Sequence, residues 1–271
     1  MQPNYWQDKI CVVTGASAGL GLAVARALAA RRAKIVLVAR RKESLEVAAA
    51  GLVATATAVL PVVADVTRQE DVVRLSQTVF DHFGSADFLC NCAGRSARSN
   101  VLDTPPGEFQ KMLDVNFLAA VRTTQAFADT LLEHRGHVVN VGSLASKVAP
   151  RFLGGYPASK FALAAFSQQL RLELGPQGLH VLLVCPGPIQ RADPAPRYQQ
   201  EGVNLPASAH QPGAGAKLRG IEPEWLADKI LDACERRRLE LVVPWKVRLL
   251  VALAQLAPRL ADWLLLRAMS G

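Results

Sequence analysis

Tyr156 and Lys160 stand four residues apart in the segment YPASK, and Ser143 lies thirteen residues before the tyrosine. On a helix, residues at this spacing share one face and lie about one turn apart. A phenol with a pKa of about 10 exchanges its proton poorly at neutral pH, but a lysine ammonium beside it lowers that pKa. With the Ser143 hydroxyl holding a carbonyl or alcohol oxygen against the phenol, these groups could move a proton on or off that oxygen. By itself, a Tyr-x-x-x-Lys pair is also typical of a solvent-exposed helix surface.

A glycine-rich turn near the N-terminus supports the catalytic interpretation. Residues 9–14 form a short apolar run that indicates a buried parallel strand, and the sequence GASAGLG follows at once, ahead of an alanine-rich helical stretch that ends near Arg32. Glycines let a backbone approach a pyrophosphate closely, and a helix N-terminus adds amide groups and the positive end of its dipole. Glycines alone can be only a tight turn, but strand, turn and helix in this order predict phosphate binding. The residues expected to contribute are Gly15, Ser17, Gly19, Leu20 and Gly21.

The spacing Thr-Gly-x-x-x-Gly-x-Gly, together with Tyr156 and Lys160, resembles the short-chain dehydrogenase/reductase family. Matches continue in order down residues 7–244. They are Asp65-Val66 after the third expected strand, Asn91-Cys92-Ala93-Gly94 after the fourth, Asn116 in a long central helix, Ser143 at the end of the fifth strand, and Pro186-Gly187 after the sixth.

This resemblance implies roles for the matching residues. Tyr156 would be the acid or base, Lys160 would lower its pKa and contact the ribose, and Ser143 would orient the substrate oxygen. Asn116 would hold a water that links the lysine to bulk solvent, although an amide in apolar company can equally bond to main chain, and both roles are compatible. The further cofactor contacts that the resemblance implies are Asp65, Val66, Asn91, Ala93, Gly94, Tyr156, Lys160, Pro186, Gly187 and Ile189.

The end of the second expected strand, residues 34–39, indicates which nicotinamide cofactor binds. Many NAD-binding relatives carry an aspartate there for the ribose hydroxyls, whereas this chain has Ala39 followed by Arg40 and Arg41. A guanidinium suits a 2′-phosphate, and a carboxylate would repel it. Ser17 could add a hydroxyl contact. The alternative is a solvated basic start of a helix. We expect NADP(H), held by Arg40 and Arg41.

Alternating strand and helix patterns predict an α/β fold: a Rossmann-like, doubly wound, mostly parallel seven-stranded sheet with helices on both faces. Ligands bind such sheets at the carboxyl ends of the strands, where Ser143, Gly94 and Pro186 all fall. We expect residues 1–244 to form a single NADP-binding catalytic domain. The strands are expected at 9–14, 34–39, 59–64, 86–92, 136–142, 180–185 and 239–243, and helices at 68–83, 114–133, 156–174 and 223–238, with a further helical stretch from Pro105.

The chain departs from its relatives after Gly187. Where they often carry a threonine that contacts the cofactor, this sequence has Arg191, which could reach the pyrophosphate instead. Residues 192–220 are rich in Pro, Ala, Gly, Ser and Gln. They are a flexible surface insertion or a lid over the substrate, and their place after a strand end favours the lid.

Residues 245–271 exceed what the sheet needs. Two apolar clusters, 249–257 and 264–266, are separated by a proline and by the charges of Arg259 and Asp262. These interrupt the run too early for a bilayer-spanning helix, which needs about 20 apolar residues. We expect two short helices joined at the proline, with tryptophans and basic residues as interfacial anchors. Peripheral membrane contact, packing on a partner subunit and covering the substrate mouth remain open.

Composition limits the other functions. Half of the 271 residues are hydrophobic and a fifth are charged, which allows a sizeable core. The net charge of +8 is spread along the chain, so we expect an anionic cofactor rather than nucleic acid. Five cysteines without framework spacing indicate reduced thiols in the cytoplasm, and the polar residues 1–9 leave no room for a signal peptide. No His/Cys/Asp constellation suggests a metal.

We therefore predict an NADP-dependent oxidoreductase acting on a carbonyl or secondary alcohol, with an apolar substrate because few ionisable groups lie near the expected pocket. The chain is similar in general look to the lipid- and steroid-handling reductases of the family. A catalytically idle NADP-binding scaffold or sensor would need only the nucleotide half, and a nucleotide-sugar epimerase or dehydratase would need a larger C-terminal domain. The resemblance also implies a homodimer or homotetramer. The helix seam expected for it carries Ala119, Ala120, Ala126, Phe166 and Leu170.

Overall fold

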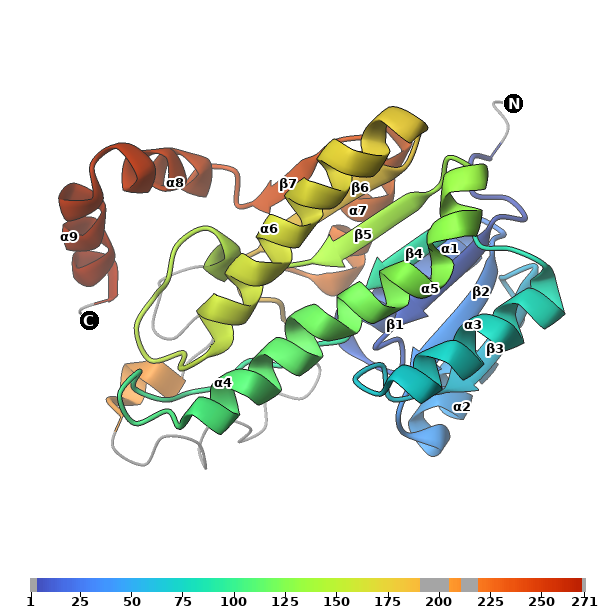
Figure 1. The fold of residues 1–271 in the computed structure, drawn as a ribbon, viewed down its shortest axis with the longest axis horizontal. Coiled ribbons are helices and arrows are strands. Elements are labelled where there is room, and N and C mark those ends of the chain that lie inside the picture. Colours follow the sequence, from blue (N-terminus) through green and yellow to red (C-terminus); the bar gives the residue numbers. More distant parts are fainter. Residues whose placement is uncertain (1–3, 191–204, 211–218, 270–271) are drawn as a thin grey trace.

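The computed structural model describes residues 4–190, 205–210 and 219–269. Within these ranges seven strands form one sheet in the order β3-β2-β1-β4-β5-β6-β7, and every neighbouring pair is parallel (Figure 1). The predicted Rossmann-like fold is confirmed. Arg191 and most of the expected lid, 192–220, lie outside the described residues.

The strands are apolar runs that suit a sheet covered on both faces. In β1, Cys11 and Val13 belong to one hydrophobic core cluster, whereas Ile10 and Val12 belong to the other, as the alternation of side chains along a strand requires. The strands are β1 (Ile10–Thr14), β2 (Lys34–Ala39), β3 (Ala58–Val63), β4 (Phe88–Asn91), β5 (His137–Val141), β6 (His180–Pro186) and β7 (Glu240–Val243).

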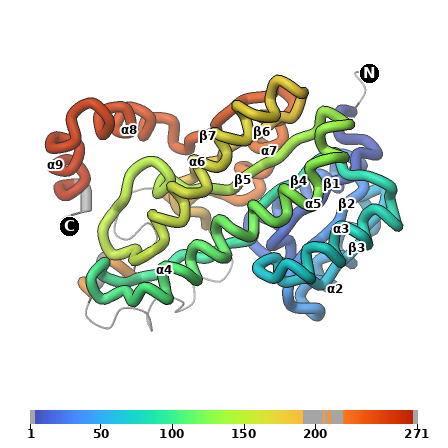
Figure 2. The backbone as a smooth tube through the Cα atoms, in the orientation of Figure 1, coloured from blue at the N-terminus to red at the C-terminus, as the bar shows by residue number. Residues whose placement is uncertain are grey.

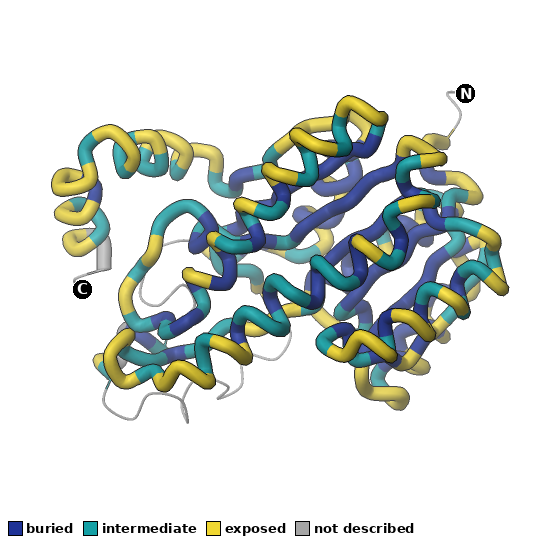
Figure 3. The backbone as a smooth tube through the Cα atoms, in the orientation of Figure 1, coloured by how far each residue is buried: buried dark blue, intermediate teal, exposed yellow. Residues whose placement is uncertain are grey.

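Helices cover both faces of the sheet, so that the strands are the most buried part of the molecule (Figure 3). One face packs against α1 (Gly19–Ala30), α2 (Lys42–Ala50) and α7 (Pro223–Glu235). The other packs against α3 (Gln69–Phe83), α5 (Ala119–Glu133) and α6 (Tyr156–Leu174). Short 3-10 turns lie at η2 (Leu144–Ser146), η3 (Gly175–Gln177) and η4 (Ala207–His210).

The long central helix differs from the expectation. Helix α4 (Pro106–Leu113) runs without a break through a π-helical segment, η1 (Asp114–Leu118), into α5, as the continuous tube in Figure 2 shows. Two separate helices were predicted. Asn116 lies in the π-helical segment and is buried. Such segments are rare and are frequently found at functional sites.

Two residues of the predicted subunit seam do not face outward. Ala119 and Ala120 are buried within the chain, and Ala126 and Leu170 pack against the core beneath α5 and α6. Ala126, Phe166 and Leu170 are partly exposed, and Phe166 meets Phe117 edge to face, with ring centroids 6.0 Å apart.

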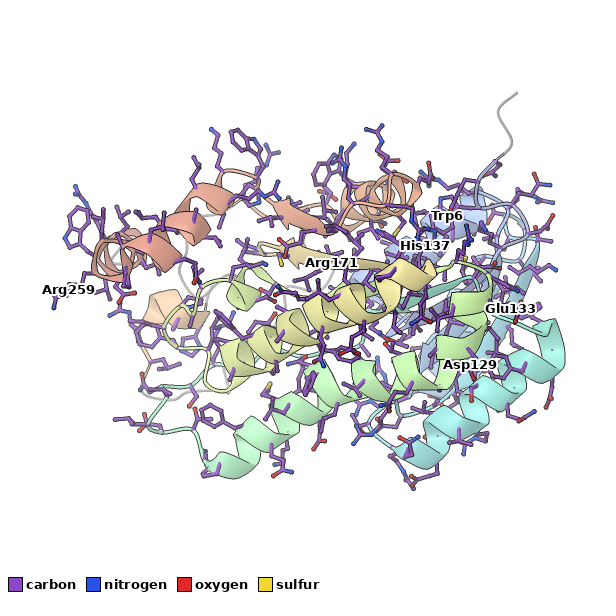
Figure 4. The ribbon with its side chains drawn as sticks, turned by 45° about the horizontal axis from the view of Figure 1, so that its top comes forward. Trp6, Asp129, Glu133, His137, Arg171 and Arg259 are labelled. Atoms are coloured by element: carbon purple, nitrogen blue, oxygen red, sulfur yellow. The ribbon has the colours of Figure 1, made fainter. Side chains whose placement is uncertain are left out.

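At the amino ends of the strands, a chain of hydrogen bonds anchors the N-terminus. The Tyr5 hydroxyl lies 2.6 Å from Nε2 of His137, the Nδ1 atoms of His137 and His180 are 2.8 Å apart, and Nε2 of His180 lies 2.8 Å from the Arg238 carbonyl oxygen. A carbonyl only accepts, so each neutral histidine donates away from Tyr5, which donates to His137. Trp6, which packs on His137 as Figure 4 shows, is fully buried.

These histidines also form, with Cys234, the one group of three potential metal ligands found in the described part of the chain, their ligand atoms lying within 4.8 Å of one another. The sequence did not reveal this group because its members are far apart along the chain. Every ring nitrogen in it already takes part in the hydrogen-bond chain. We therefore assign the group to the anchoring of the N-terminus.

The chain ends in two helices, α8 (Val247–Leu256) and α9 (Pro258–Met269), that follow β7. They meet at Pro258, where the sequence predicted the joint. None of the helices in the described ranges has the length and apolar character to cross a membrane.

The buried histidines predict acid-sensitive stability. Burial lowers the pKa of His137 to about 3 and that of His180 to about 4, whereas both should titrate near 6.5 in the unfolded chain. The unfolded state therefore binds more protons between these values, and the free energy of unfolding should fall as the pH drops below 6.5.

Urea unfolding as a function of pH tests this. His137→Gln should reduce the slope of the unfolding free energy by about 1.4 kcal/mol per pH unit between pH 4.5 and 5.5, because one fewer proton is taken up. His82→Gln, at an exposed position on α3, is the matched control and should leave the slope of the unfolding free energy against pH unchanged. Equal slopes for wild type and His137→Gln would contradict the prediction.

Candidate active site

Thr14 joins the loops after β1 and β4. It begins the glycine-rich motif, but no role was predicted for its side chain. Its hydroxyl oxygen accepts hydrogen bonds from the backbone amides of Cys92 and Ala93, both at 3.1 Å, and lies 3.3 Å from the Cys90 carbonyl oxygen, to which it donates. The side chain is buried. It therefore sets the position of the glycine turn relative to the loop that carries Gly94.

The glycine turn is shaped for close approach. Gly15 has a φ of +67°, and a Cβ there would lie 3.0 Å from the Ala93 backbone, while one at Gly21 would lie 2.4 Å from the Gly15 carbonyl oxygen. Helix α1 begins at Gly19 with no side-chain cap and no acidic residue in its first turn, and a Cβ at Gly19 would meet nothing within 4 Å. Among the described residues no side chain caps the amides of this first turn, which fits a pyrophosphate.

Asn91, predicted to bind cofactor, uses its side chain inside the protein. Its Nδ2 donates to Asn140 Oδ1 at 2.9 Å, and its Oδ1 accepts from the Thr123 hydroxyl at 2.7 Å. Asn140 in turn donates to the Ser167 hydroxyl on α6 at 2.9 Å. This buried network fixes β4 and β5 against α5 and α6. It leaves the backbone of Asn91 for any contact with a nucleotide.

The side chain of Asn116 is hydrogen-bonded to the main chain of the loop after β4. Its Oδ1 accepts from the Arg95 amide and its Nδ2 donates to the Arg95 carbonyl oxygen, each at 2.9 Å. The same Nδ2 lies 3.0 Å from the hydroxyl of Ser159, which donates to the Tyr156 carbonyl oxygen at 2.7 Å. The amide therefore links the π-helical segment, the loop and the start of α6. Ser159 was missed, although it lies within the YPASK segment, because a serine at that position carries no local signal.

Lys160 is 95% removed from solvent, with 5% of its surface exposed. Its Nζ donates to the Val141 carbonyl oxygen at 2.8 Å and lies 5.8 Å from the centre of the Tyr156 ring. Burial lowers the pKa of this amine to about 8. A phenolate or a ribose hydroxyl close to this amine would favour the charged form of Lys160.

Ser143 stands at the carboxyl end of β5 on a capped turn. Its hydroxyl accepts from the Ala145 amide at 3.1 Å, and its own amide donates to the Ser146 hydroxyl, also at 3.1 Å. The resulting turn, η2, packs against α6, which begins with Tyr156. The hydroxyl proton of Ser143 is not used by this cap and is available to a substrate oxygen. Leu153 packs on Tyr156 and makes the adjoining wall apolar.

The predicted adenosine end lies beyond β2 and β3. Arg40 is exposed, and its Nη1 is 3.7 Å from Asp65 Oδ2. The other carboxylate oxygen of Asp65 accepts from the amide and hydroxyl of Thr67 at 3.0 and 2.7 Å. Arg41 precedes α2 and is exposed as well, whereas the Val66 side chain is buried. The two arginines are therefore open to an anion.

The segment after β6 is held in place from two sides. The Gly187 amide donates to the Val243 carbonyl oxygen at 2.7 Å, and Ile189 forms a parallel bridge with Ile221. Pro186 is buried at the end of β6. This segment borders the same edge of the sheet as Ser143 and Gly94.

Comparisons with known proteins agree with this arrangement. A family model described as short chain dehydrogenase matches residues 9–201. An uncharacterized oxidoreductase of Staphylococcus aureus is 34% identical over 227 residues, which cover 83% of this chain and 90% of the relative. The structure of L-sorbose reductase from Gluconobacter frateurii, complexed with NADPH and L-sorbose, is 26% identical with a TM-score of 0.78, covering 89% of this chain and 97% of that one. A short chain dehydrogenase/reductase of Burkholderia phymatum in complex with NAD is similar in fold, with 23% identity and a TM-score of 0.83 over 94% of this chain and 95% of that one.

The close packing at Gly94 yields a prediction. A Cβ there would lie 2.7 Å from Asn116 Oδ1 and 3.6 Å from Lys160 Nζ, and the Asn116 amide is bonded too firmly to give way. Gly94→Ala should lower the free energy of unfolding by about 1–3 kcal/mol. It should also weaken nucleotide binding, so the addition of NADPH should raise the melting temperature of this variant less than that of the wild-type protein.

Gly107→Ala is the matched control. A Cβ at Gly107, in the first turn of α4, would meet nothing within 4 Å. This variant should keep its stability and its response to NADPH. If both substitutions behave alike, the contact between Gly94 and Asn116 does not constrain the site.

Proposed function

The chain belongs to the short chain dehydrogenase family, and on that premise we propose that it is an NADP-dependent oxidoreductase that moves a hydride between the cofactor and a carbonyl or secondary alcohol. The observation that carries the proposal is the setting of Lys160. A buried amine, hydrogen-bonded to the Val141 carbonyl oxygen and close to the Tyr156 ring, costs stability and has no evident structural use. Such a cost is expected where an amine serves chemistry.

The protein residues account for the proton. When bound, the nicotinamide ring would supply or accept the hydride. During reduction, Tyr156 donates its hydroxyl proton to the carbonyl oxygen and becomes a phenolate, which the Lys160 ammonium stabilises. Ser143 donates a hydrogen bond to the same oxygen and holds it against the tyrosine. In the oxidising direction the phenolate takes the proton back from the alcohol.

NADP(H) is the cofactor that the adenosine end favours. Ala39 stands where an acidic residue would bind ribose hydroxyls and repel a phosphate. The Arg40–Asp65 pair is exposed and 3.7 Å long, so it is weak and can yield to a 2′-phosphate. Both cofactors occur in structures of similar fold. The preference therefore rests on these arginines.

An apolar substrate suits the walls of the site. Leu153 packs on Tyr156, and Leu144 follows Ser143 directly. An apolar carbonyl compound, lipid- or steroid-like, gains free energy by leaving water for such a surface. Four of the five cysteines are buried and all are free, which suits the reducing conditions of the cytoplasm.

We further propose a homodimer or homotetramer, as is usual for the family. The surface formed by η1 and α6 remains the best location, because Phe117 and Phe166 are both partly exposed there. Next to it on α5, Nη1 of Arg122 is buried and has no hydrogen-bond partner within the described residues.

Tyr156→Phe tests the reaction. The variant keeps the ring but loses the proton, so NADPH oxidation across a panel of ketones and aldehydes should slow about 100- to 10,000-fold, while NADPH binding persists. Tyr5→Phe is the control, since Tyr5 lies at the opposite edge of the sheet and should leave the rate unchanged. A wild-type protein that binds NADPH but turns over no carbonyl compound would favour a sensor or scaffold instead.

Arg40→Ala tests the cofactor preference. A 2′-phosphate on this guanidinium gains roughly 1.5–3 kcal/mol, so wild type should bind NADPH at least about tenfold more tightly than NADH. The substitution should narrow that gap in isothermal titration calorimetry. Arg26→Ala, an exposed arginine on α1, should leave it intact. Equal affinities of the wild-type protein for the two cofactors would refute the assignment.

A further inference from the structure

The two C-terminal helices stand apart from the sheet. They follow β7 at its carboxyl end, so they lie beyond the same edge of the sheet as Ser143 and Tyr156 (Figure 1). In Figure 3 they are almost entirely exposed or intermediate, in contrast to the helices that cover the sheet. Helix α8 touches β7 and α9, and α9 packs mainly on α8.

Large apolar side chains are exposed throughout this extension, which we define as residues 245–269. A water-soluble surface rarely gathers so many in one place. The six most exposed are Trp245 (66%), Leu249 (69%), Leu256 (85%), Leu260 (48%), Trp263 (52%) and Leu266 (47%).

On α9 the apolar and basic groups share the outer surface. Ala261 is 1% exposed and marks the inner side of the helix. Leu260, Trp263 and Leu266 are exposed, and so are the basic residues Arg259 and Arg267 close to them in the sequence. The Arg267 guanidinium lies 5.4 Å from the centre of the Trp263 ring. Arg259 points away from the body of the protein in Figure 4.

The charges of the extension are unequal. Lys246, Arg248, Arg259 and Arg267 are all exposed, and Asp262 is the single acidic residue among residues 245–269. Basic side chains reach phosphate groups from long apolar stems, and tryptophan prefers the boundary between headgroups and acyl chains. A surface that combines both is complementary to an anionic bilayer.

The lengths of the helices favour a position on the bilayer surface. Helix α8 has 10 residues and α9 has 12, and Pro258 separates them. A spanning helix needs about 20 residues. Amphipathic helices of this kind bury their apolar side chains to a shallow depth and leave their backbone groups hydrogen-bonded within the helix.

We propose that α8 and α9 bind the surface of an anionic lipid bilayer and hold the carboxyl edge of the sheet toward it. The binding itself is independent of catalysis. Its use, which rests on the proposed function, is to let an apolar carbonyl compound pass from the lipid to Tyr156 without crossing water. A partner subunit on the same surface would make the extension an oligomer contact instead.

Co-sedimentation of the full-length protein with vesicles tests the binding. The protein should sediment with vesicles of phosphatidylcholine and phosphatidylserine and bind vesicles of phosphatidylcholine alone about tenfold more weakly, because the anionic headgroups attract the basic residues. Raising the salt concentration from about 0.1 M to about 1 M shortens the Debye length from about 10 to about 3 Å and should release part of the bound protein.

Point variants identify the surface. Leu249→Glu with Trp263→Glu removes two exposed apolar side chains without disturbing the core, and should reduce vesicle binding about tenfold or more. Arg259→Glu should weaken binding to the anionic vesicles alone. Val47→Glu is the control, because Val47 is 75% exposed on α2 and lies outside the extension. It should bind as wild type does.

Two further measurements separate the outcomes. Tyr156→Phe should sediment as wild type does, so a failure of the proposed reaction would leave the membrane proposal standing. Light scattering without lipid reports the subunit number. A full-length protein that never sediments with anionic vesicles overturns the proposal, as does a subunit number that drops in Leu249→Glu with Trp263→Glu while vesicle binding stays unchanged.

Discussion

The hydrogen-bonded amide of Asn116 is the interaction on which the geometry of the candidate active site depends. It binds both backbone groups of Arg95 and the hydroxyl of Ser159, and so it joins a loop after β4 to the first turn of α6. Gly94 is confined against the same amide. Asn116 lies buried in the π-helical segment, which continues directly into α5. The hydrogen bonds of its amide therefore fix the position of the loop after β4 relative to the turn of α6 that begins with Tyr156.

The opposite edges of the sheet show two ways of burying polar groups. At the amino edge, His137 and His180 stay neutral and satisfy each other, Tyr5 and a carbonyl oxygen, which stabilises the docked N-terminus. At the carboxyl edge, Lys160 is buried with one carbonyl partner at 2.8 Å and a lowered amine pKa. The first arrangement completes its hydrogen bonds within the protein. The second keeps an amine in a costly setting that a bound ligand can improve.

Polar networks behind the site keep these groups rigid. Asn91, Asn140 and Ser167 connect two strands to α6 inside the core, and Thr14 fixes the glycine turn to the neighbouring loop. A buried polar group without a partner would destabilise the core, so all members of this network are needed together. The residues of the candidate site can therefore come from separate elements and still hold one geometry.

The sequence by itself determined the strands, the glycine turn and the Tyr156–Lys160 pair, because each is a local pattern of apolar runs, turn residues or helical spacing. It also predicted where the candidate site lies, since the ends of parallel strands meet at one edge. Only the tertiary structure decided what each side chain bonds. The partners of Asn116 lie 21 and 43 residues away, and those of His137 lie 132 and 43 residues away. The same holds for the buried face of α5, which includes Ala119 and Ala120 although both were predicted to face outward. Such contacts depend on distances that the whole sheet closes, and no local periodicity records them.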